Sequence, residues 1–319
     1  MMKSSSIDAL KGALILWVIG GHMAEVLHLE HIAFWIGSGF RMPLMVAVSG
    51  YLLNLERVRQ APFGDIGYRY WKRMILPWLV ASCVYLLPRG DAVSWMTPLD
   101  IVLRPSYHLW YIPVLCLLIL SARYARFSPA LLVMLSAPLS VGMMIGYGLY
   151  HEVIGTGIWA FDSRFLSYPL YFFFGVLMAR LEPSMAHRTA GVAVAILGLA
   201  GWIYLYESSD LGLQVSARLA MNLGLIALLP VFARLPIRIA PVNAIGRASL
   251  FYYLWHPLLI GLLLAQGLDP WTALLLTITL LAAVHRLMAD MPVLPTLLGT
   301  PPVRRTDTDG KPALAVSAI

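Results

Sequence analysis

Long runs of apolar residues, separated by short polar stretches, repeat along the whole chain. The runs cover residues 7–28, 32–54, 74–88, 107–122, 130–150, 164–181, 189–206, 214–233, 244–265 and 270–289. Most of them approach the roughly 20 apolar residues that an α-helix needs to cross a bilayer. They are continuous and do not alternate with polar residues, which argues against the strands of an outer-membrane barrel. The pattern predicts an all-α, polytopic integral membrane protein with about ten transmembrane helices.

Composition excludes the other broad classes of protein. Of the 319 residues, 60% are hydrophobic and only 12% are charged, whereas a soluble domain carries about 25% charged residues. A soluble globular protein, a disordered chain and a secreted disulfide scaffold are therefore all excluded. The runs leave room for short loops and one tail. We predict a transmembrane domain over residues 1–290 and a flexible cytoplasmic tail over residues 291–319.

The basic residues predict an orientation. With the N-terminus in the cytoplasm, the loops on the inner side carry Arg57, Arg59, Arg69, Lys72, Arg73, Arg123, Arg126, Arg180, Arg188, Arg234 and Arg238. The loops on the outer side carry only Arg89, Arg104 and Arg164. Positively charged loops stay in the cytoplasm, so both termini are predicted to be cytoplasmic. The net charge of +7 then reflects topology, and no nucleic-acid partner is expected.

Two cysteines, Cys83 and Cys116, lie inside apolar runs. A disulfide framework or a metal cluster needs more cysteines at closer spacing. We therefore expect two small core residues and no metal site.

The first apolar run contains a stripe of residues spaced alternately three and four apart, which places them on one face of a helix. The stripe consists of Asp8, Lys11, Ile15, Val18, His22 and Glu25. Lys11 and His22 are then about 16 Å apart along the helix axis, and Gly20 and Gly21 leave space beside His22. The stripe is typical of a reactive path. Spacing alone equally allows Lys11 to reach the interface and His22 to be an interhelical hydrogen bonder.

Ionisable residues in or beside two further runs are candidates for function, because charge inside a membrane is costly. Arg41 is followed closely by Pro43, a combination that favours a broken helix lining a cavity. Arg69, Lys72 and Arg73 precede the third run at the inner surface. They could bind phosphates, although ordinary anchoring by positive charge explains them as well.

Two groups of polar residues fall at the predicted outer surface. His108 and Trp110 belong to an aromatic segment at the start of the fourth run. Aromatic residues are usual at a membrane interface, but a histidine among them is not. Asp162 and Arg164 open the sixth run and predict an ion pair or a ligand contact.

Two later runs also carry polar residues. Arg218 and Asn222 lie four residues apart in the eighth run, on one helix face. His256 directly precedes Pro257 in the middle of the ninth run. A proline at that position predicts a kink in the preceding turn.

Five segments, taken in order, resemble the membrane acyltransferase-3 family, and most closely its fucose 4-O-acetylase-like branch. They are Ile7–Gly12 with His22, Phe40–Leu44 with Ser49–Tyr51, Tyr107–Tyr111, Phe161–Arg164 with Phe172–Gly175, and Ser249 with Tyr253–Pro257. Lys11 stands where many members have arginine. Arg41 stands where the branch usually has histidine, which leaves the role of that position open.

The resemblance implies an integral-membrane O-acyltransferase of the cell inner (plasma) membrane. Such enzymes move an acyl group, most commonly acetyl from cytoplasmic acetyl-CoA, to a hydroxyl of an extracytoplasmic glycan or a lipid-linked sugar. Membrane lipid and other proteins of polysaccharide synthesis are the expected partners.

The resemblance also implies roles for single residues. His22 and Lys11 are the predicted catalytic residues, with His22 as a general base or as a nucleophile. The predicted donor-binding residues are Lys11, Ser49, Arg69, Lys72 and Arg73. The predicted acceptor-binding residues are Arg41, His108, Trp110, Asp162, Arg164 and His256.

Two other functions use the same residues. A secondary transporter or flippase of a polysaccharide pathway would use the intramembrane His, Lys and Arg as a relay, and such proteins often have two related halves, which the sequence does not show. A structural subunit of a polysaccharide synthesis complex would not need the stripe of Lys11 and His22.

Overall fold

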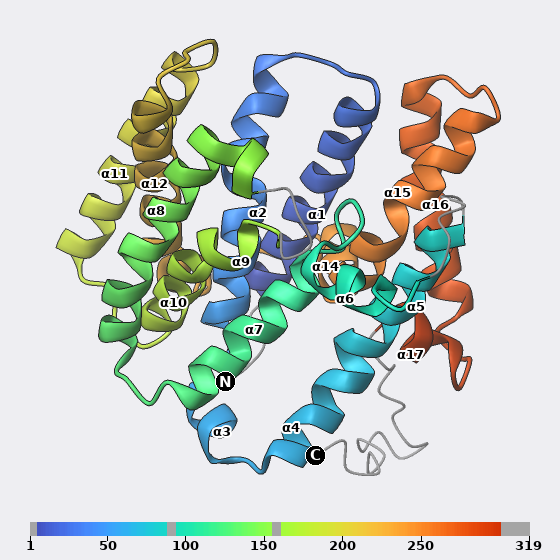
Figure 1. Ribbon diagram of the computed structural model, residues 1–319, viewed down its shortest axis with the longest axis horizontal. Helices are drawn as coiled ribbons and strands as arrows, with labels where there is room; N and C mark the ends of the chain where they lie inside the picture. Colours follow the sequence, from blue (N-terminus) through green and yellow to red (C-terminus); the bar gives the residue numbers. More distant parts are fainter. Residues whose placement is uncertain (1–4, 88–93, 155–160, 301–319) are drawn as a thin grey trace.

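The computed structural model describes residues 5–87, 94–154 and 161–300, and every regular element in them is helical (Figure 1). The first half contains α1 (Ser5–Val26), α2 (Ile32–Tyr51), α3 (Leu55–Gln60), α4 (Phe63–Tyr70), the π-helical turn η1 (Trp71–Ile75), α5 (Leu76–Leu86), α6 (Thr97–Leu103), α7 (Tyr111–Tyr124) and α8 (Pro129–Ile154). The second half contains α9 (Arg164–Ser167), α10 (Pro169–Met178), α11 (Met185–Tyr204), α12 (Leu211–Ala227), α13 (Leu229–Phe232), α14 (Ala240–Arg247), α15 (Ser249–Ala265), α16 (Pro270–Leu287) and α17 (Leu294–Leu298).

The prediction of an all-α polytopic membrane protein is confirmed. Within the described residues, six stretches are long and apolar enough to cross a membrane: α1, α2, residues 129–150 of α8, α11, residues 211–232 of α12 and α13, and α16. The pair α14 and α15, bent by 88°, raises the number of candidate spans to seven. Each of the ten apolar runs coincides with a helix. However, α5, α7 and α10 have only 11, 14 and 10 residues, so the number ten stays a prediction.

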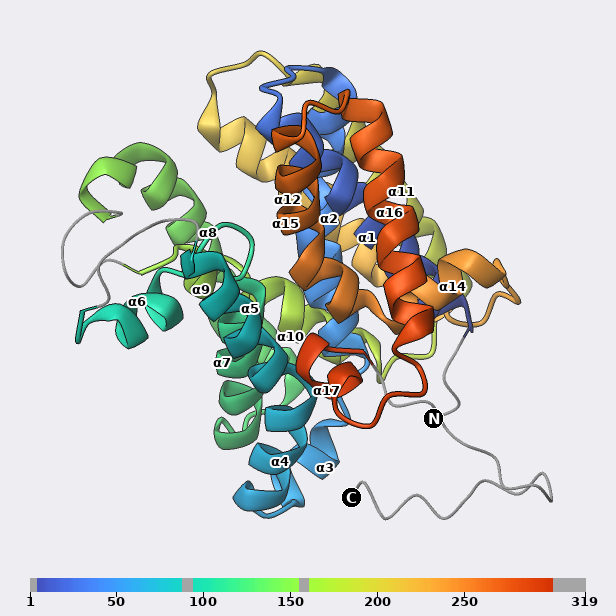
Figure 2. The ribbon, with the colours of Figure 1, turned by 90° about the vertical axis from the view of Figure 1, so that its right-hand side faces the viewer.

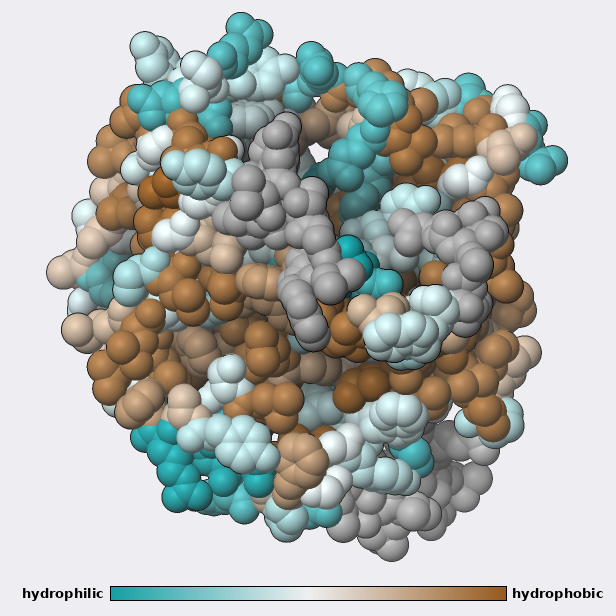
Figure 3. Space-filling model, in the orientation of Figure 1, coloured by the Kyte–Doolittle hydropathy of each residue, from teal (hydrophilic) through white to brown (hydrophobic). Residues whose placement is uncertain are grey.

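The helices differ in how deeply they are buried, which separates central helices from peripheral ones. Half or more of the apolar stretch is buried in α1 and α12, but less than a quarter in α8, α11 and α16. The peripheral helices expose large apolar residues, for example Leu197 and Leu275. On the face that Figure 3 shows, large apolar areas lie between hydrophilic residues at the top and bottom edges, and a few hydrophilic residues lie near the centre. An apolar outer surface of this kind is suited to lipid.

The loops fall at two opposite ends of the molecule. Figures 1 and 2 show the α1–α2, α11–α12 and α15–α16 loops together at one end, which we call the outer end. Helices α3 and α4 lie at the opposite end, which we call the inner end. This arrangement agrees with the alternation that the basic loops predict; the orientation in the membrane and the cytoplasmic placement of the termini stay predictions.

The start of the predicted tail is part of the folded structure. Residues 294–298 form α17, which packs against α5, and the indole of Trp255 donates a hydrogen bond of 3.0 Å to Leu298 O. The folded domain therefore continues past residue 290 to Thr300. Residues 301–319 lie outside the described residues. Cys83 is exposed and Cys116 is partly buried, so the expectation of two core cysteines is wrong for Cys83.

Candidate active site

Three histidines from distant parts of the sequence meet inside the helix bundle. His22 comes from α1, His108 from the turn before α7, and His256 from the middle of α15. The ring centre of His22 lies 5.7 Å from that of His108 and 5.1 Å from that of His256. The ring centres of His108 and His256 are 5.3 Å apart. His108 and His256 are almost fully buried, whereas 23% of the His22 side chain is exposed. We call these residues the histidine cluster; His22 is its accessible member.

A carboxylate holds the ring of His22. The Oε2 atom of Glu25 lies 3.1 Å from His22 Nδ1, and the other carboxylate oxygen forms an ion pair with Arg41 of α2. A carboxylate at Nδ1 favours the tautomer with its proton on Nδ1, which leaves the lone pair of Nε2 available to accept a proton. The same orienting role is played by the carboxylate of a Ser-His-Asp triad. The arrangement Arg41–Glu25–His22 can therefore prepare Nε2 as a base or nucleophile.

Gly21 is what allows Arg41 to reach Glu25. A Cβ atom at Gly21 would lie 1.4 Å from Arg41 Nη1, while a Cβ at Gly20 would meet nothing within 4 Å. The arginine thus crosses α1 where the helix has no side chain. The space predicted beside His22 exists at Gly21, and a side chain of the protein fills it. Arg41 is 8% exposed, so Glu25 compensates a charge that is largely removed from solvent.

Tyr85 links α5 to the middle of α15 and to His108. Helix α15 continues through Pro257, and the amide of Leu258 donates to the hydroxyl of Tyr85 at 2.9 Å. The carbonyl of Leu254 then accepts a bond of 3.0 Å from Tyr85 and lies 3.3 Å from His108 Nε2. The 88° bend lies between α14 and α15, before the histidine. The bend that was predicted at Pro257 therefore lies earlier in the chain, and the carbonyl of Leu254 connects Tyr85 with His108.

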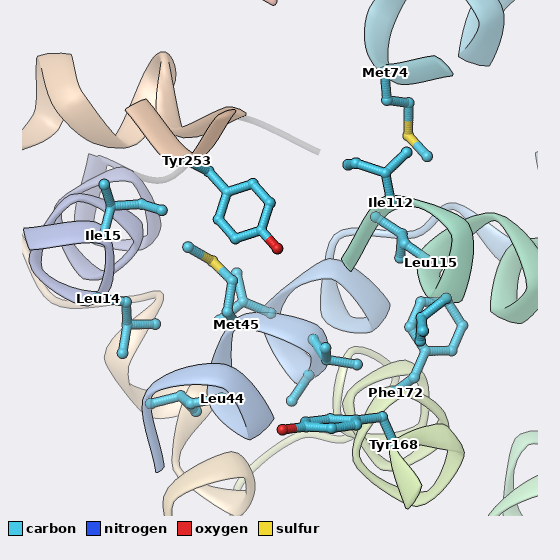
Figure 4. Packing of buried hydrophobic residues seen from close by; sticks show 14 of the residues in the cluster. Leu14, Ile15, Leu44, Met45, Met74, Ile112, Leu115, Tyr168, Phe172 and Tyr253 are labelled. Carbon is cyan, nitrogen blue, oxygen red and sulfur yellow. The ribbon is translucent and has the colours of Figure 1, made fainter. Parts of the chain in front are cut away.

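Several buried polar atoms in this region have no hydrogen-bond partner among the described residues. They are His108 Nδ1, His256 Nε2 and the hydroxyl of Tyr253. Figure 4 shows this hydroxyl directed from α15 toward the space between α2 and α7. Ser49 Oγ, a predicted donor-site residue, lies 2.7 Å from Tyr111 Oη, and the rings of Tyr111 and Tyr253 are 5.3 Å apart. Buried polar groups are normally paired, so these atoms indicate a place where a polar ligand binds.

The histidines are not arranged as a metal site. In the described part of the chain, no group of three or more His, Cys, Asp or Glu side chains could hold a metal ion. The contact between His22 and Glu25 suits the imidazole for proton transfer and for nucleophilic attack.

The predicted outer residues form a second group next to the histidine cluster. Arg164 and Asp162 form the expected ion pair, with 3.0 Å between Nη1 and Oδ2. The guanidinium of Arg164 also lies 4.7 Å from the ring centre of Trp110, which packs against Tyr168. Trp110 follows His108 by two residues in the same turn, so this turn joins the two groups.

The residues predicted to bind the donor lie in two separate places. Arg69 and Lys72 belong to α4 and η1 at the inner end, and η1 also carries Arg73. Burial and the neighbouring positive charges of Arg57 and Arg73 lower the pKa of the Arg69 guanidinium. Crowded cations of this kind favour an anionic ligand. We call Arg57, Arg69, Lys72 and Arg73 the inner basic group.

The two lysines of the predicted donor site both have polar partners in the structure. The ammonium of Lys11 on α1 forms an ion pair with Asp8 Oδ1 at 3.2 Å. The ammonium of Lys72 lies 2.5 Å from the hydroxyl of Tyr68. Lys11 and His22 share the helix face that the stripe predicted, because Ile15 and Val18 between them are fully buried.

Comparison with known sequences identifies the protein family. A profile of the acyltransferase domain matches residues 4–284, which is most of the chain. The chain belongs to the acyltransferase-3 family. It is therefore a membrane acyltransferase, with an acyl donor and an acceptor as substrates. A search of curated proteins and a search of solved structures found no match.

Three residues that shape the site of this acyltransferase were not predicted as site residues. Glu25 was visible in the stripe of α1, since it follows His22 by three residues and so lies on the same face. Tyr253 belongs to one of the segments that carry the family resemblance, although no role was predicted for it. Tyr85 gave no signal, because a tyrosine in an apolar run is ordinary until its hydroxyl is seen between two helices.

Proposed function

We propose that this acyltransferase moves an acetyl group from cytoplasmic acetyl-CoA to a hydroxyl of an extracytoplasmic or lipid-linked glycan, in the cell inner membrane. The observation that carries the proposal is the contact of His22 with Glu25, which is itself paired with Arg41. A sugar as the acceptor rests on the resemblance to the fucose 4-O-acetylase-like branch.

The proposed reaction replaces the C–S bond of the thioester with a C–O bond to the acceptor and moves one proton from oxygen to sulfur. The acceptor oxygen attacks the carbonyl carbon of the thioester, the C–S bond breaks, and CoA leaves as a thiolate. His22 Nε2 removes the proton of the acceptor hydroxyl and gives it to the departing sulfur, so that charge and protons balance. A two-step route through an acyl-imidazole on Nε2 needs the same orientation of the ring.

Donor binding follows from the position of the inner basic group. The nucleotide of CoA carries several phosphates, and arginine binds a phosphate through two parallel hydrogen bonds. Arg57, Arg69 and Arg73 lie close enough together to affect one another's charge. They lie at the inner end, whereas His22 lies toward the outer end of α1, so a donor held there has to extend into the bundle toward the histidine cluster.

Sidedness of the donor tests the proposal directly. In everted membrane vesicles, radiolabelled acetyl-CoA added to the medium should label a glycan acceptor, because the predicted cytoplasmic face is then accessible. Sealed right-side-out vesicles should give no label until they are permeabilised. Labelling from intact right-side-out vesicles would reverse the orientation. An absence of transfer to any member of a broad acceptor panel, in both preparations, would reject the O-acyltransferase proposal.

Replacing Arg73 with alanine should raise the KM for acetyl-CoA by roughly 10- to 100-fold, because a charge-assisted contact is worth about 1.5–3 kcal/mol. The change in kcat should be smaller, as expected when uniform binding is lost. Arg73→Lys should restore only part of the affinity, since lysine lacks the forked donor.

The matched control is Arg126→Ala, which removes another exposed arginine of the inner end outside the inner basic group. It should leave the KM for acetyl-CoA unchanged. Kinetics are normalised to folded protein, so a role in insertion alone would appear as lower abundance with an unchanged KM. That result for Arg73, Arg69 and Lys11 together would remove the donor assignment.

A further inference from the structure

A cavity opens between α8, α10 and α12. Its volume is about 340 Å³, which is within the usual range for sites that bind small ligands. A second cavity of about 230 Å³ adjoins it and shares Tyr147, Ser163 and Arg164 with it. We call the larger one the outer cavity, because residues near the α11–α12 loop at the outer end line it.

The outer cavity is positively charged. Two arginines, Arg164 and Arg218, line it, and among its described lining residues there is no carboxylate. Arg164 is partly compensated by Asp162. In the part of the chain that the structure describes, Arg218 forms no salt bridge. A guanidinium that is half-buried without a counter-ion is an electrostatic cost to the empty protein and a favourable partner for an anionic ligand.

The guanidinium of Arg218 is held in place by a hydrogen bond from its Nε atom. Its Nε donates to the carbonyl of Gly39 on α2 at 3.2 Å, and Asn222 donates to the same oxygen at 2.9 Å. Among the described residues, no hydrogen bond or salt bridge uses the two terminal nitrogens of Arg218. These nitrogens form the fork that recognises a carboxylate or phosphate. The side chain is thus anchored at one end and available at the other.

The remaining lining residues suit a sugar ring. Four aromatic and three polar side chains line the outer cavity: Tyr147, Tyr168, Tyr171 and Trp202, and Ser163, Ser167 and Gln214. Tyr147 is the exposed one of the four aromatic residues, and the other three form the packed wall behind it. A sugar ring presents hydroxyls around its edge and C–H groups on its faces, so it needs both kinds of contact. Small-molecule sites in general combine aromatic walls with a few fixed polar groups.

The outer cavity is connected to the histidine cluster through a short chain of contacts. Arg164 lines the cavity and covers Trp110 at 4.7 Å. Trp110 lies in the same turn as His108, whose ring is 5.7 Å from that of His22. The lining of the outer cavity is therefore linked to the histidine cluster through Arg164 and the turn that carries Trp110 and His108.

We infer that the outer cavity binds the acceptor as a sugar unit carrying a negatively charged group, a carboxylate or a phosphate, with Arg218 as the main contact of that group. That the ligand of this cavity is the acceptor of acyl transfer rests on the proposed function. The preference for a negatively charged ligand rests on the cavity itself. A neutral sugar would leave Arg218 without a partner, whereas an anionic one pairs with it.

The test is ligand binding to the purified full-length protein in lipid nanodiscs, without acetyl-CoA. Methyl β-glucuronide and methyl β-glucoside form a matched pair that differs in a carboxylate against a hydroxymethyl group, and glucose 1-phosphate supplies the phosphate. We expect at least one anionic sugar to bind about tenfold or more tightly than the glucoside, a difference of about 1.4 kcal/mol. The tighter of the two anionic sugars identifies the charged group.

Variants of Arg218 test whether the preference for an anionic sugar arises in the outer cavity. Arg218→Gln should abolish the preference for the anionic sugar, Arg218→Lys should keep part of it, and Arg126→Gln at the inner end should leave it intact. Equal binding of charged and neutral sugars by the wild-type protein would overturn the inference. So would a charge preference that Arg218→Gln leaves unchanged. If the Gln variant fails to fold, the wild-type comparison and the Lys variant still decide.

Failure of this inference and failure of the proposed function are distinguishable. Charge-selective binding that depends on Arg218, without acetyl transfer in everted vesicles, would reject the acetyl-transfer reaction and keep the anionic-sugar site. Acetyl transfer with equal affinity for neutral and anionic sugars would keep the acetyl-transfer reaction and reject the anionic-sugar site.

Discussion

Replacing His22 with alanine should lower acyl transfer by about 10²- to 10⁴-fold, because a general base typically contributes that much. The loss should appear in kcat at saturating acetyl-CoA. The protein should still insert and accumulate, since His22 is partly exposed and its ion pair is with Glu25 on the same helix. Activity per folded protein, measured with labelled acetyl-CoA, gives the result.

The control for this prediction is His28→Asn, which removes another imidazole near the outer end of α1. His28 has a φ of 51°, and asparagine tolerates that conformation better than alanine. It should keep near-wild-type activity. If the His22→Ala variant retained more than about a tenth of wild-type turnover, well short of the loss expected for a general base, His22 would not be the base.

Replacing Glu25 with glutamine should lower kcat by roughly 10- to 100-fold, the usual effect of removing a group that orients a functional side chain. The KM for acetyl-CoA should stay the same, because Glu25 lies far from the inner basic group. Glutamine keeps the size of the side chain but loses the charge that fixes the Nδ1 proton and stabilises the imidazolium.

Folding and catalysis can be separated in this variant. Removing the Glu25 charge leaves the largely buried Arg41 without its partner, which destabilises the protein. In the double variant Glu25→Gln with Arg41→Met, abundance should recover because the unpaired charge is gone, while kcat should remain low. Full recovery of kcat in the double variant would mean that Glu25 only neutralises Arg41. A kcat within twofold of wild type in Glu25→Gln alone would exclude an orienting role.

The helices of this protein were predictable from the sequence because the bilayer imposes their length. A backbone without water must satisfy its hydrogen bonds internally, so each long apolar run becomes a helix wherever it lies in the chain. The α1 stripe was predictable for the same local reason: a helical period fixes which side chains share a face. Lys11, His22 and Glu25 could therefore be placed on one face before any tertiary contact was known.

The short apolar runs show the limit of that argument. Hydropathy treats the run at 164–181 like the longer ones, yet it begins with the single turn α9 and continues as α10 with 10 residues. The predicted tail is a further example, since α17 is held by Trp255 and α5. Both outcomes depend on neighbouring helices, which a window of sequence does not contain.

The composition of the candidate site was partly readable from the sequence, and its geometry was not. Each histidine stood out as an ionisable residue in or beside an apolar run. Their convergence depends on packing between α1, α15 and the turn before α7. Arg41 reaches Glu25 only because Gly21 lacks a side chain, and His108 contacts the carbonyl of Leu254, which also accepts a hydrogen bond from Tyr85 of α5. Local periodicity thus determined the helices and the stripe of α1, whereas contacts between segments distant in sequence decided the histidine cluster, the outer cavity and the partner of each charge.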